Sequence, residues 1–174
     1  MNNEKQIIRK WLFIFITALF ISGLTAMPVE SELNFIVNHF PFEGSIKGFL
    51  QEVLAAIQYA GRDYPFLFYG YDWLAFAHFA LAILFIGPLK DPVKNKWVIE
   101  FGIITCLLII PFALVAGHFR GLPLWWRLVD CSFGIIGLLP LIICLQKIKM
   151  IEAKEKEETE NKQEFNLLII NHKN

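Results

Sequence analysis

The chain has 174 residues, the length of about one domain. Hydrophobic residues make up 56% of it and charged residues only 18%, and the mean hydropathy is +0.50. A soluble domain of this size has too small an interior to bury so much apolar surface, so we expect a lipid bilayer to cover part of it. The 16 basic and 16 acidic residues cancel, which argues against nucleic acid as a partner. The three cysteines lie in apolar stretches without a CxxC spacing, so we expect buried thiols and no disulfide framework.

Four stretches are long and apolar enough to cross ~30 Å of hydrocarbon as helices. They predict an all-α integral membrane protein with four transmembrane helices and a helical loop between the first two. The predicted segments are, in chain order, 1–10 (N-terminus), 11–27 (first span), 28–71 (loop), 72–89 (second span), 90–96 (loop), 97–118 (third span), 119–123 (loop), 124–146 (fourth span) and 147–174 (charged tail). Every tryptophan stands at the N-terminal end of a span, where an indole favours the headgroup level.

Lysine and arginine predict the orientation of the spans. They concentrate in residues 1–10, 90–96 and 147–174, whereas the 28–71 loop carries only Lys47 and Arg62. We therefore expect both termini in the cytoplasm and the 28–71 and 119–123 loops outside.

The first span has a competing interpretation as a cleaved secretory signal, because it follows a basic segment and Ala26 could precede a cleavage site. Leu24, where a small residue is needed, and the length of the apolar run favour an uncleaved span.

The 28–71 loop carries a helical pattern. Pro28 is expected to open one helix at its first position, and Ser45 to cap a second helix that ends at Gly61. This pair of helices either lies on the membrane and caps the bundle or forms a lid over a site. In the tail, acid–base pairs four residues apart (Glu152 with Lys156, Lys154 with Glu158) predict a solvated helix.

Ionisable residues inside a span cost roughly 2.5–3.5 kcal/mol each on insertion scales, so each needs a partner or a purpose. This chain has seven near or within its spans: Asp72, His78, Glu100, His118, Arg120, Arg127 and Asp130. The expected orientation places six of them toward the outer leaflet. Glu100 is the exception, and it lies within reach of Lys94 and Lys96.

Two helical stripes of polar and small residues are expected to face the interior of the helix bundle. They are Asp72, Ala75, His78 and Ala82 on the second span, and Arg127, Asp130, Gly134, Gly137 and Leu141 on the fourth. Pro111 is expected to kink the third span.

Three interpretations of this polar cluster stay open. In the first, it is an internal network of ion pairs, with Asp130 bound to Arg120 or Arg127 and Asp72 to the other arginine. In the second, it binds an anionic small molecule or lipid headgroup, because guanidinium groups hold such anions in a bidentate fork. The ligand-binding residues would then be Asp72, His78, His118, Arg120, Arg127 and Asp130.

The third interpretation is a zinc site at His78, His118 and Asp130, with His39 as a fourth ligand, although no metal-binding motif accompanies them. We expect no cofactor. Membrane lipids are the expected partners, and a homo-oligomer is an open alternative. Our first expectation for the function of the chain is that it has no catalytic activity. The alternative is an intramembrane enzyme, with or without a metal ion, that acts on an envelope lipid or a lipid-linked substrate, with His78 and Asp130 as the catalytic candidates.

The segment from Tyr69 to Gly137, with the runs YGYDWLAFAHF, WVIEFG and RGLPLWWRLVDCSFGIIG, resembles functionally uncharacterised small four-helix membrane proteins of bacteria. This resemblance implies a location in the bacterial inner membrane and no particular activity. The order of its polar residues is also similar to that of the VanZ-like family. The matching positions would be Asp72, His78, Glu100, Arg120 or Arg127, Asp130, Gly134 and Gly137. This resemblance implies an envelope-related role, with low-level glycopeptide resistance as the trait associated with that family.

Overall fold

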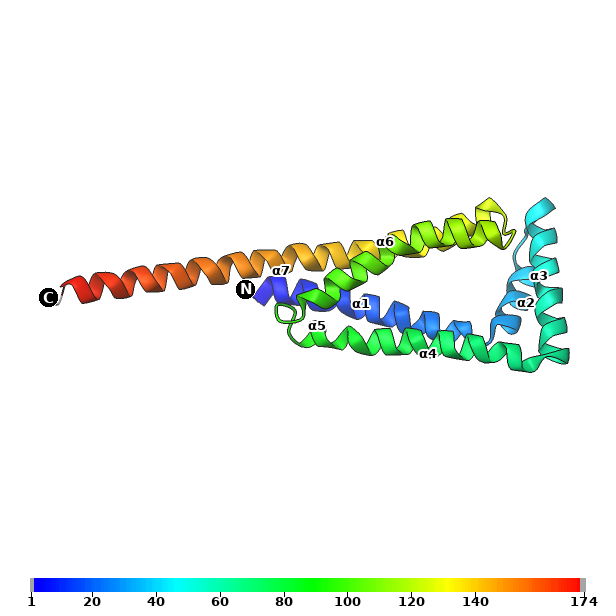
Figure 1. Cartoon of the computed structure of the whole chain (residues 1–174), viewed down its shortest axis with the longest axis horizontal. Coiled ribbons are helices and arrows are strands. Elements are labelled where there is room, and N and C mark those ends of the chain that lie inside the picture. Colours follow the sequence, from blue (N-terminus) through cyan, green and yellow to red (C-terminus); the bar gives the residue numbers. More distant parts are fainter. Residues whose placement is uncertain (1, 173–174) are drawn as a thin grey trace. The chain divides into compact units, whose positions relative to one another are not determined.

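The computed structural model describes the backbone of residues 2–172 and the side chains of residues 3–164 (Figure 1). All the regular structure in this range is helical. The elements are α1 (Asn2–Ala26), α2 (Val29–His39), α3 (Gly44–Asp63), the 3₁₀ helix η1 (Pro65–Phe68), α4 (Tyr69–Leu84), α5 (Ile86–Lys90), α6 (Lys96–Phe119) and α7 (Leu124–His172).

Four helical stretches are long and apolar enough to cross a membrane: Asn3–Ala26, Pro65–Lys90, Lys96–Phe119 and Leu124–Glu164. Large apolar side chains on α6 and α7 are exposed, among them Phe112 at 74% and Phe133 at 65%. Exposed apolar surface of this kind marks a face that contacts a membrane or another protein, and the length of these helices favours the membrane. The chain is thus an all-α, four-span membrane protein, as the hydrophobic lengths predicted.

The second span forms over Pro65–Lys90, which includes the predicted residues 72–89, and it contains a break in its helix. Helix α4 ends at Leu84, and the short helix α5 follows from Ile86. Pro88 explains the break, because proline has no N–H for the Leu84 carbonyl four residues earlier and its ring collides with that carbonyl.

The chain divides into two compact units. We call the first the hairpin unit; it comprises the chain up to Phe15 and from Leu84 onward. The second, the loop unit, is Ile16–Ile83. Each unit has its own packing and is described by itself.

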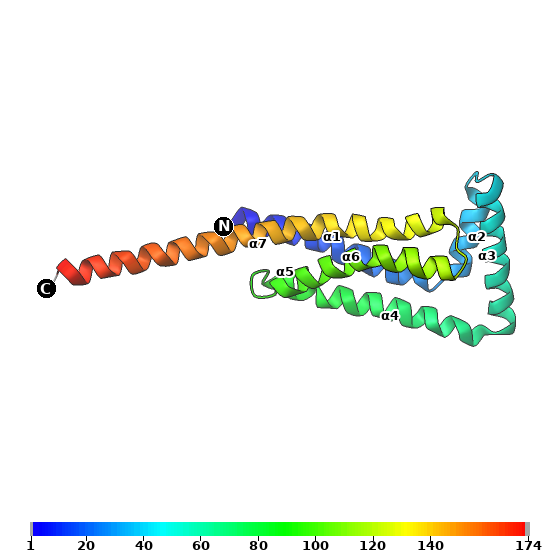
Figure 2. The same ribbon diagram turned by 45° about the horizontal axis from the view of Figure 1, so that its top comes forward.

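Helices α6 and α7 lie side by side as the main pair of the hairpin unit (Figure 2). Their close approach depends on glycines: a Cβ added at Gly134 would lie 2.5 Å from the Cys106 carbonyl oxygen. A Cβ at Gly137 would lie 2.9 Å from the Cys106 sulfur. Leu141, on the same stripe, is fully buried. These contacts confirm that the small-residue stripe of the fourth span faces another helix.

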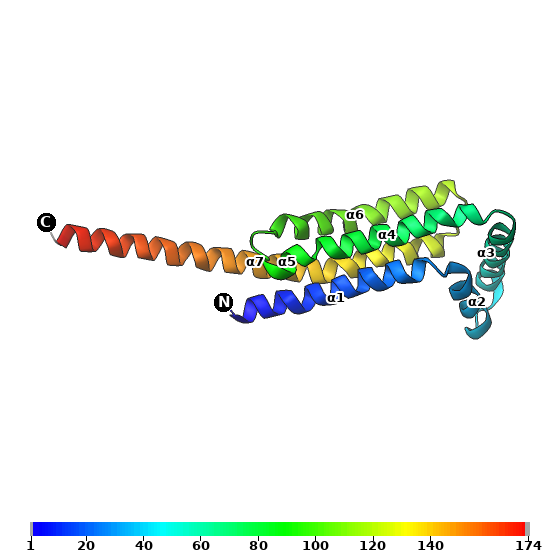
Figure 3. The same ribbon diagram turned by 90° about the horizontal axis from the view of Figure 1, so that it is seen from below.

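Helix α7 continues far beyond the predicted end of the fourth span (Figure 3). Ile148 and Ile151, which the prediction assigned to a charged tail, are fully buried. Ile8 of α1 is also fully buried, and its carbonyl oxygen lies 3.7 Å from the Cys144 sulfur.

The lysines and glutamates of the tail make different ion pairs from those predicted. Glu152 pairs with Lys96 at 2.7 Å and Lys154 with Glu4 at 2.8 Å, and neither pairs four residues along its own helix. Local spacing could not show that these side chains project toward the first turns of α6 and α1.

Helices α2 and α3 pack against each other in the loop unit, with Leu33 and Leu50 as their buried residues. Both predicted helices form, but their ends differ. Pro28 occupies the N-cap of α2 and not its first turn. Ser45 is not the cap of α3, because that helix already begins at Gly44, whose φ of +60° suits glycine.

The loop unit also joins the second half of α1 to α4. A Cβ at Gly23 would lie 2.9 Å from the Ala75 carbonyl oxygen and 3.0 Å from the His78 Cβ. The predicted stripe of the second span therefore turns Ala75, which is buried, toward α1. Asp72, one turn earlier, is exposed.

Candidate functional site at the α6–α7 turn

The six predicted ligand residues fall into two groups. Asp72 and His78 belong to the loop unit, and His118, Arg120, Arg127 and Asp130 belong to the hairpin unit. The four residues of the hairpin unit surround one short turn between α6 and α7.

His78 has no local feature that marks it as a catalytic base or a ligand. Its Nδ1 lies 2.8 Å from the Leu74 carbonyl oxygen, one turn back on the same helix. The exposed His39 makes the same bond to Phe35 at 3.0 Å. The contact is thus an ordinary histidine-to-backbone bond within a helix.

The backbone of the turn follows the Schellman pattern of helix termination. The Leu122 N–H donates to the Gly117 carbonyl at 2.9 Å and the Gly121 N–H to the His118 carbonyl at 3.1 Å. Gly121 holds a left-handed φ of +72°, which glycine adopts without strain. The sequence contains a local signal for this turn, because Gly121 follows a long apolar stretch and Pro123 comes two residues after that glycine.

Arg127 is the most constrained charged side chain of the turn. A Cβ at Gly117 would lie 2.5 Å from the Arg127 Cγ and 2.7 Å from its Cδ, so the absence of a side chain at Gly117 makes room for the arginine stem. Its Nη1 donates to the Leu114 carbonyl at 3.3 Å. Its Nε is buried and has no hydrogen-bond partner among the described residues. Sequence reasoning identified the arginine but missed the glycine that accommodates it.

The predicted ion-pair network does not form in the hairpin unit. Within the described part of this unit, Asp130 makes no ion pair with Arg120 or Arg127. Arg120 and His118 are exposed, and Asp130 is half-buried. The pair between Asp130 and Arg127 does not form because the Arg127 side chain is directed toward α6. Its stem lies against Gly117, and its guanidinium group bonds to the α6 backbone.

Glu100 makes no close ion pair with Lys94 or Lys96 in the described structure, although its charge acts on the Lys96 ammonium group. It is exposed on α6, while Lys96 binds Glu152 and Lys94 lies 3.5 Å from Asp91. Lys94 also donates its backbone N–H to Asp91 at 3.2 Å. Helix α6 continues through Pro111 and does not end there.

Among the described residues of either unit, no three histidine, cysteine, aspartate or glutamate side chains gather as a metal site would require. The predicted set His78, His118 and Asp130 takes its residues from both units, and only His118 and Asp130 share one.

The positive charges at the α6–α7 turn favour the binding of an anion. Arg127 belongs to the first turn of α7, where helix N–H groups carry a partial positive charge, and Arg120 is the C-cap residue of α6 at the other end of the same short turn. Trp125 and Trp126 open this helix with their ring centroids 5.5 Å apart, in the edge-to-face arrangement. Indoles at such a position mark the headgroup level of a bilayer.

The fold and this turn thus define a four-span membrane protein with a cationic helix–helix turn. No protein-family model matches the chain, and neither the curated proteins nor the solved structures contain a significant match.

Proposed function

We propose that the protein is a non-catalytic protein of the bacterial inner membrane that binds an anionic headgroup at the α6–α7 turn. The orientation rests on the lysines and arginines of residues 1–10, 90–96 and 147–174, which favour the cytoplasmic side. With both termini in the cytoplasm, the α6–α7 turn lies at the outer face of the membrane.

The observation that carries the proposal is the unpartnered Nε of Arg127. This donor is buried and bonds to no described residue, while Nη1 of the same group is already bound to the Leu114 carbonyl. An unsatisfied buried donor costs about 1–3 kcal/mol, more when it is charged. A phosphate oxygen that reached this donor, after a local movement of the side chains that cover it, would remove that cost, and guanidinium binds phosphate with two parallel N–H donors.

Arg120 supplies the second charge. It is the C-cap residue of α6 and is exposed. A simpler role is available, because a cation near a helix C-terminus stabilises the helix by typically about 0.3–1 kcal/mol. That role would not depend on which lipid surrounds the protein, and this difference separates the two roles experimentally.

The test measures the thermal unfolding of the purified full-length protein in nanodiscs of phosphatidylcholine alone or with one-third phosphatidylglycerol. We expect the anionic lipid to raise the unfolding temperature of the wild type. In the double variant Arg120→Gln, Arg127→Lys the rise should be mostly lost, since one charge and one bidentate fork are removed while the stem over Gly117 is kept.

Arg62→Gln is the matched control, because Arg62 is an exposed arginine of the loop unit that is engaged by Asp63 at 3.2 Å. It should keep the full response. Glycerol phosphate added to phosphatidylcholine discs distinguishes a soluble anion from a lipid headgroup. An equal response of the wild type and the double variant to phosphatidylglycerol would refute the proposal.

A further inference from the structure

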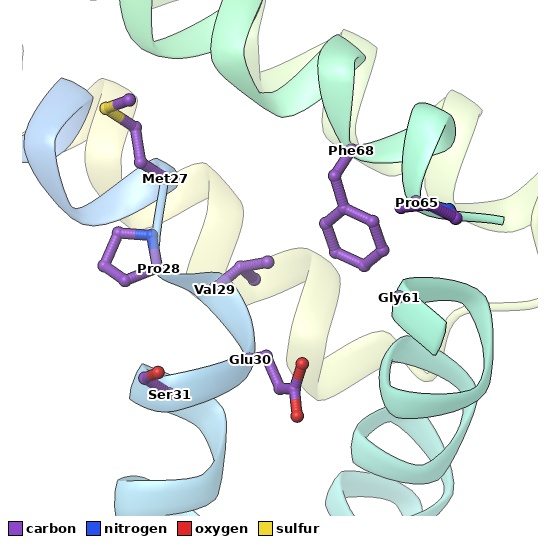
Figure 4. A pocket seen from close by; sticks show the side chains of 8 residues that line it. All are labelled: Met27, Pro28, Val29, Glu30, Ser31, Gly61, Pro65 and Phe68. Carbon is purple, nitrogen blue, oxygen red and sulfur yellow. The ribbon is translucent and has the colours of Figure 1, made fainter. Parts of the chain in front are cut away.

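The loop unit contains a small cleft at the start of α2 that the α6–α7 turn does not involve (Figure 4). It has a volume of about 280 Å³ and is lined by residues 27–31, Gly61, Pro65 and Phe68. This volume is at the lower limit of ligand pockets, which suits only a small molecule or a single headgroup.

The charge of the lining selects the sign of the ligand. Glu30 is the one formally charged residue among the described residues that line the cleft. Arg62, the basic residue next to Gly61 in the sequence, forms an ion pair with Asp63. Its guanidinium carbon lies 6.0 Å from the centroid of the Tyr59 ring. The whole 28–71 loop carries five acidic residues against two basic ones, so the surrounding field also attracts cations.

An aromatic ring stands beside the carboxylate. The Oε2 of Glu30 and the Cε2 of Phe68 each lie 3.6 Å from the position that a Cβ of Gly61 would take. Both side chains point into the space that this glycine leaves open (Figure 4). Tyr71 stacks on Phe68 with ring centroids 5.5 Å apart and restricts the orientation of the ring.

From this arrangement we infer that the cleft binds the ammonium group of a small organic cation, through the Glu30 carboxylate and the Phe68 ring. A carboxylate beside an aromatic ring is the combination that recognises alkylammonium groups. The cleft lies in the segments where the first span ends and the second begins, so the ammonium can come from a free amine or from a lipid headgroup.

The competing role for Glu30 is to stabilise the N-terminus of α2. That helix end carries about half a positive charge, which favours an acid in its first turn. Glu32 lies in the same first turn but does not line the cleft. If stabilising the helix were the whole role, the two glutamates would be equivalent.

The experiment uses choline as the probe and 3,3-dimethylbutan-1-ol as its uncharged analogue of the same shape. Binding to the full-length protein in an uncharged maltoside detergent is measured by isothermal titration calorimetry. We expect choline to bind and the alcohol to bind at least about fivefold more weakly, as expected for one partly exposed charge pair. Glu30→Gln should weaken choline binding about fivefold, and Glu32→Gln should leave it unchanged.

Gly61→Leu provides a second variant, because its side chain would occupy the cleft without changing its charge. It should abolish choline binding, and circular dichroism checks that it keeps its helices. If it does not fold, Gly61→Ala replaces it with the same expectation of weaker binding. Equal binding of choline and the alcohol, or equal effects of Glu30→Gln and Glu32→Gln, would overturn the inference.

The source of the ammonium is then decided by competition. Phosphatidylethanolamine in mixed micelles should displace choline if the natural ligand is a headgroup, whereas phosphatidylglycerol should not. Choline binding that withstands phosphatidylethanolamine supports a free amine. None of these variants alters the arginines of the α6–α7 turn, so this inference and the proposed function fail or succeed separately.

Discussion

The Lys96 ammonium group donates to both carboxylate oxygens of Glu152, at 2.7 and 3.1 Å, across 56 residues of sequence. Lys96 is the first residue of α6, and Glu152 lies on the part of α7 beyond the predicted fourth span. This pair and the buried Ile148 and Ile151 show that residues 148–152 of α7 are packed within the hairpin unit and are not part of a free tail.

Breaking the Lys96–Glu152 pair should destabilise the protein more than breaking the Lys156–Glu160 pair. The first pair is 28% and 34% exposed, while the second is 77% and 65% exposed and therefore screened by water. A double-mutant cycle with Lys96→Met and Glu152→Gln, followed by thermal unfolding, measures the coupling. The same cycle on Lys156 and Glu160 is the control, and a coupling as small as that of the control would contradict the prediction.

Gly134→Ala should lower the free energy of unfolding by about 1–3 kcal/mol, because the new Cβ would lie 2.5 Å from the Cys106 carbonyl and the helices would have to separate. Gly48→Ala is the matched control, since a Cβ there meets open space among the described residues. That control should be neutral or stabilising by up to about 1 kcal/mol, because alanine favours helix. Unfolding in mixed micelles of increasing denaturing detergent gives both values.

Gly121→Ala should destabilise the α6–α7 turn by about 1 kcal/mol, because an L-residue is strained at the φ of +72° that the turn requires. Gly70→Ala changes a helical glycine whose Cβ would meet open space in the described structure, and it should not destabilise. Thermal unfolding of both variants in the same detergent compares them. A neutral Gly121→Ala would mean that the turn relaxes without cost.

Acid should weaken the turn between α5 and α6 at Asp91. The Lys94 backbone N–H donates to this carboxylate and, with the nearby ammonium group, holds the pKa of Asp91 below its ordinary value of 3.8. A folded-state pKa below the unfolded value means that the stabilisation is present above pH 3.8 and is lost as pH falls through the lower value.

The measurement compares the unfolding temperature of the wild type and Asp91→Ala from about pH 6 down to about pH 2.5, the range over which an aspartate titrates. The difference between them should be constant above pH 4, roughly, and should shrink below it. A difference independent of pH would show that the Asp91 carboxylate contributes nothing through its charge.

Several features of the fold could be predicted from single residues and their periods. The spans followed from hydrophobic length, and the stripe of Gly134 and Gly137 followed from helical spacing, since both are properties of one helix alone. Pro88 could also have been interpreted from the sequence as the end of α4, because the loss of the Leu84 hydrogen bond is a local effect.

The partners of charged side chains could not be predicted in this way. Arg127 has Asp130 one turn away on its own helix, yet its stem lies against Gly117 and its guanidinium group bonds to the Leu114 backbone. Glu152 has Lys156 at the ideal local spacing, yet it pairs with Lys96. The direction of a long side chain depends on which neighbouring helix leaves room for it, and spacing along one helix does not contain that information.

The sequence by itself determined an all-α chain with four spans, because each span must satisfy its backbone hydrogen bonds within its own apolar length. It also determined that arginines would flank the turn between the third and fourth spans. Only the tertiary structure decided that Arg127 packs on Gly117 with an unpartnered Nε, and that Glu30 and Phe68 share a cleft beside Gly61. Those arrangements depend on contacts between segments far apart in the chain, where close packing selects one side-chain direction among several that local geometry permits.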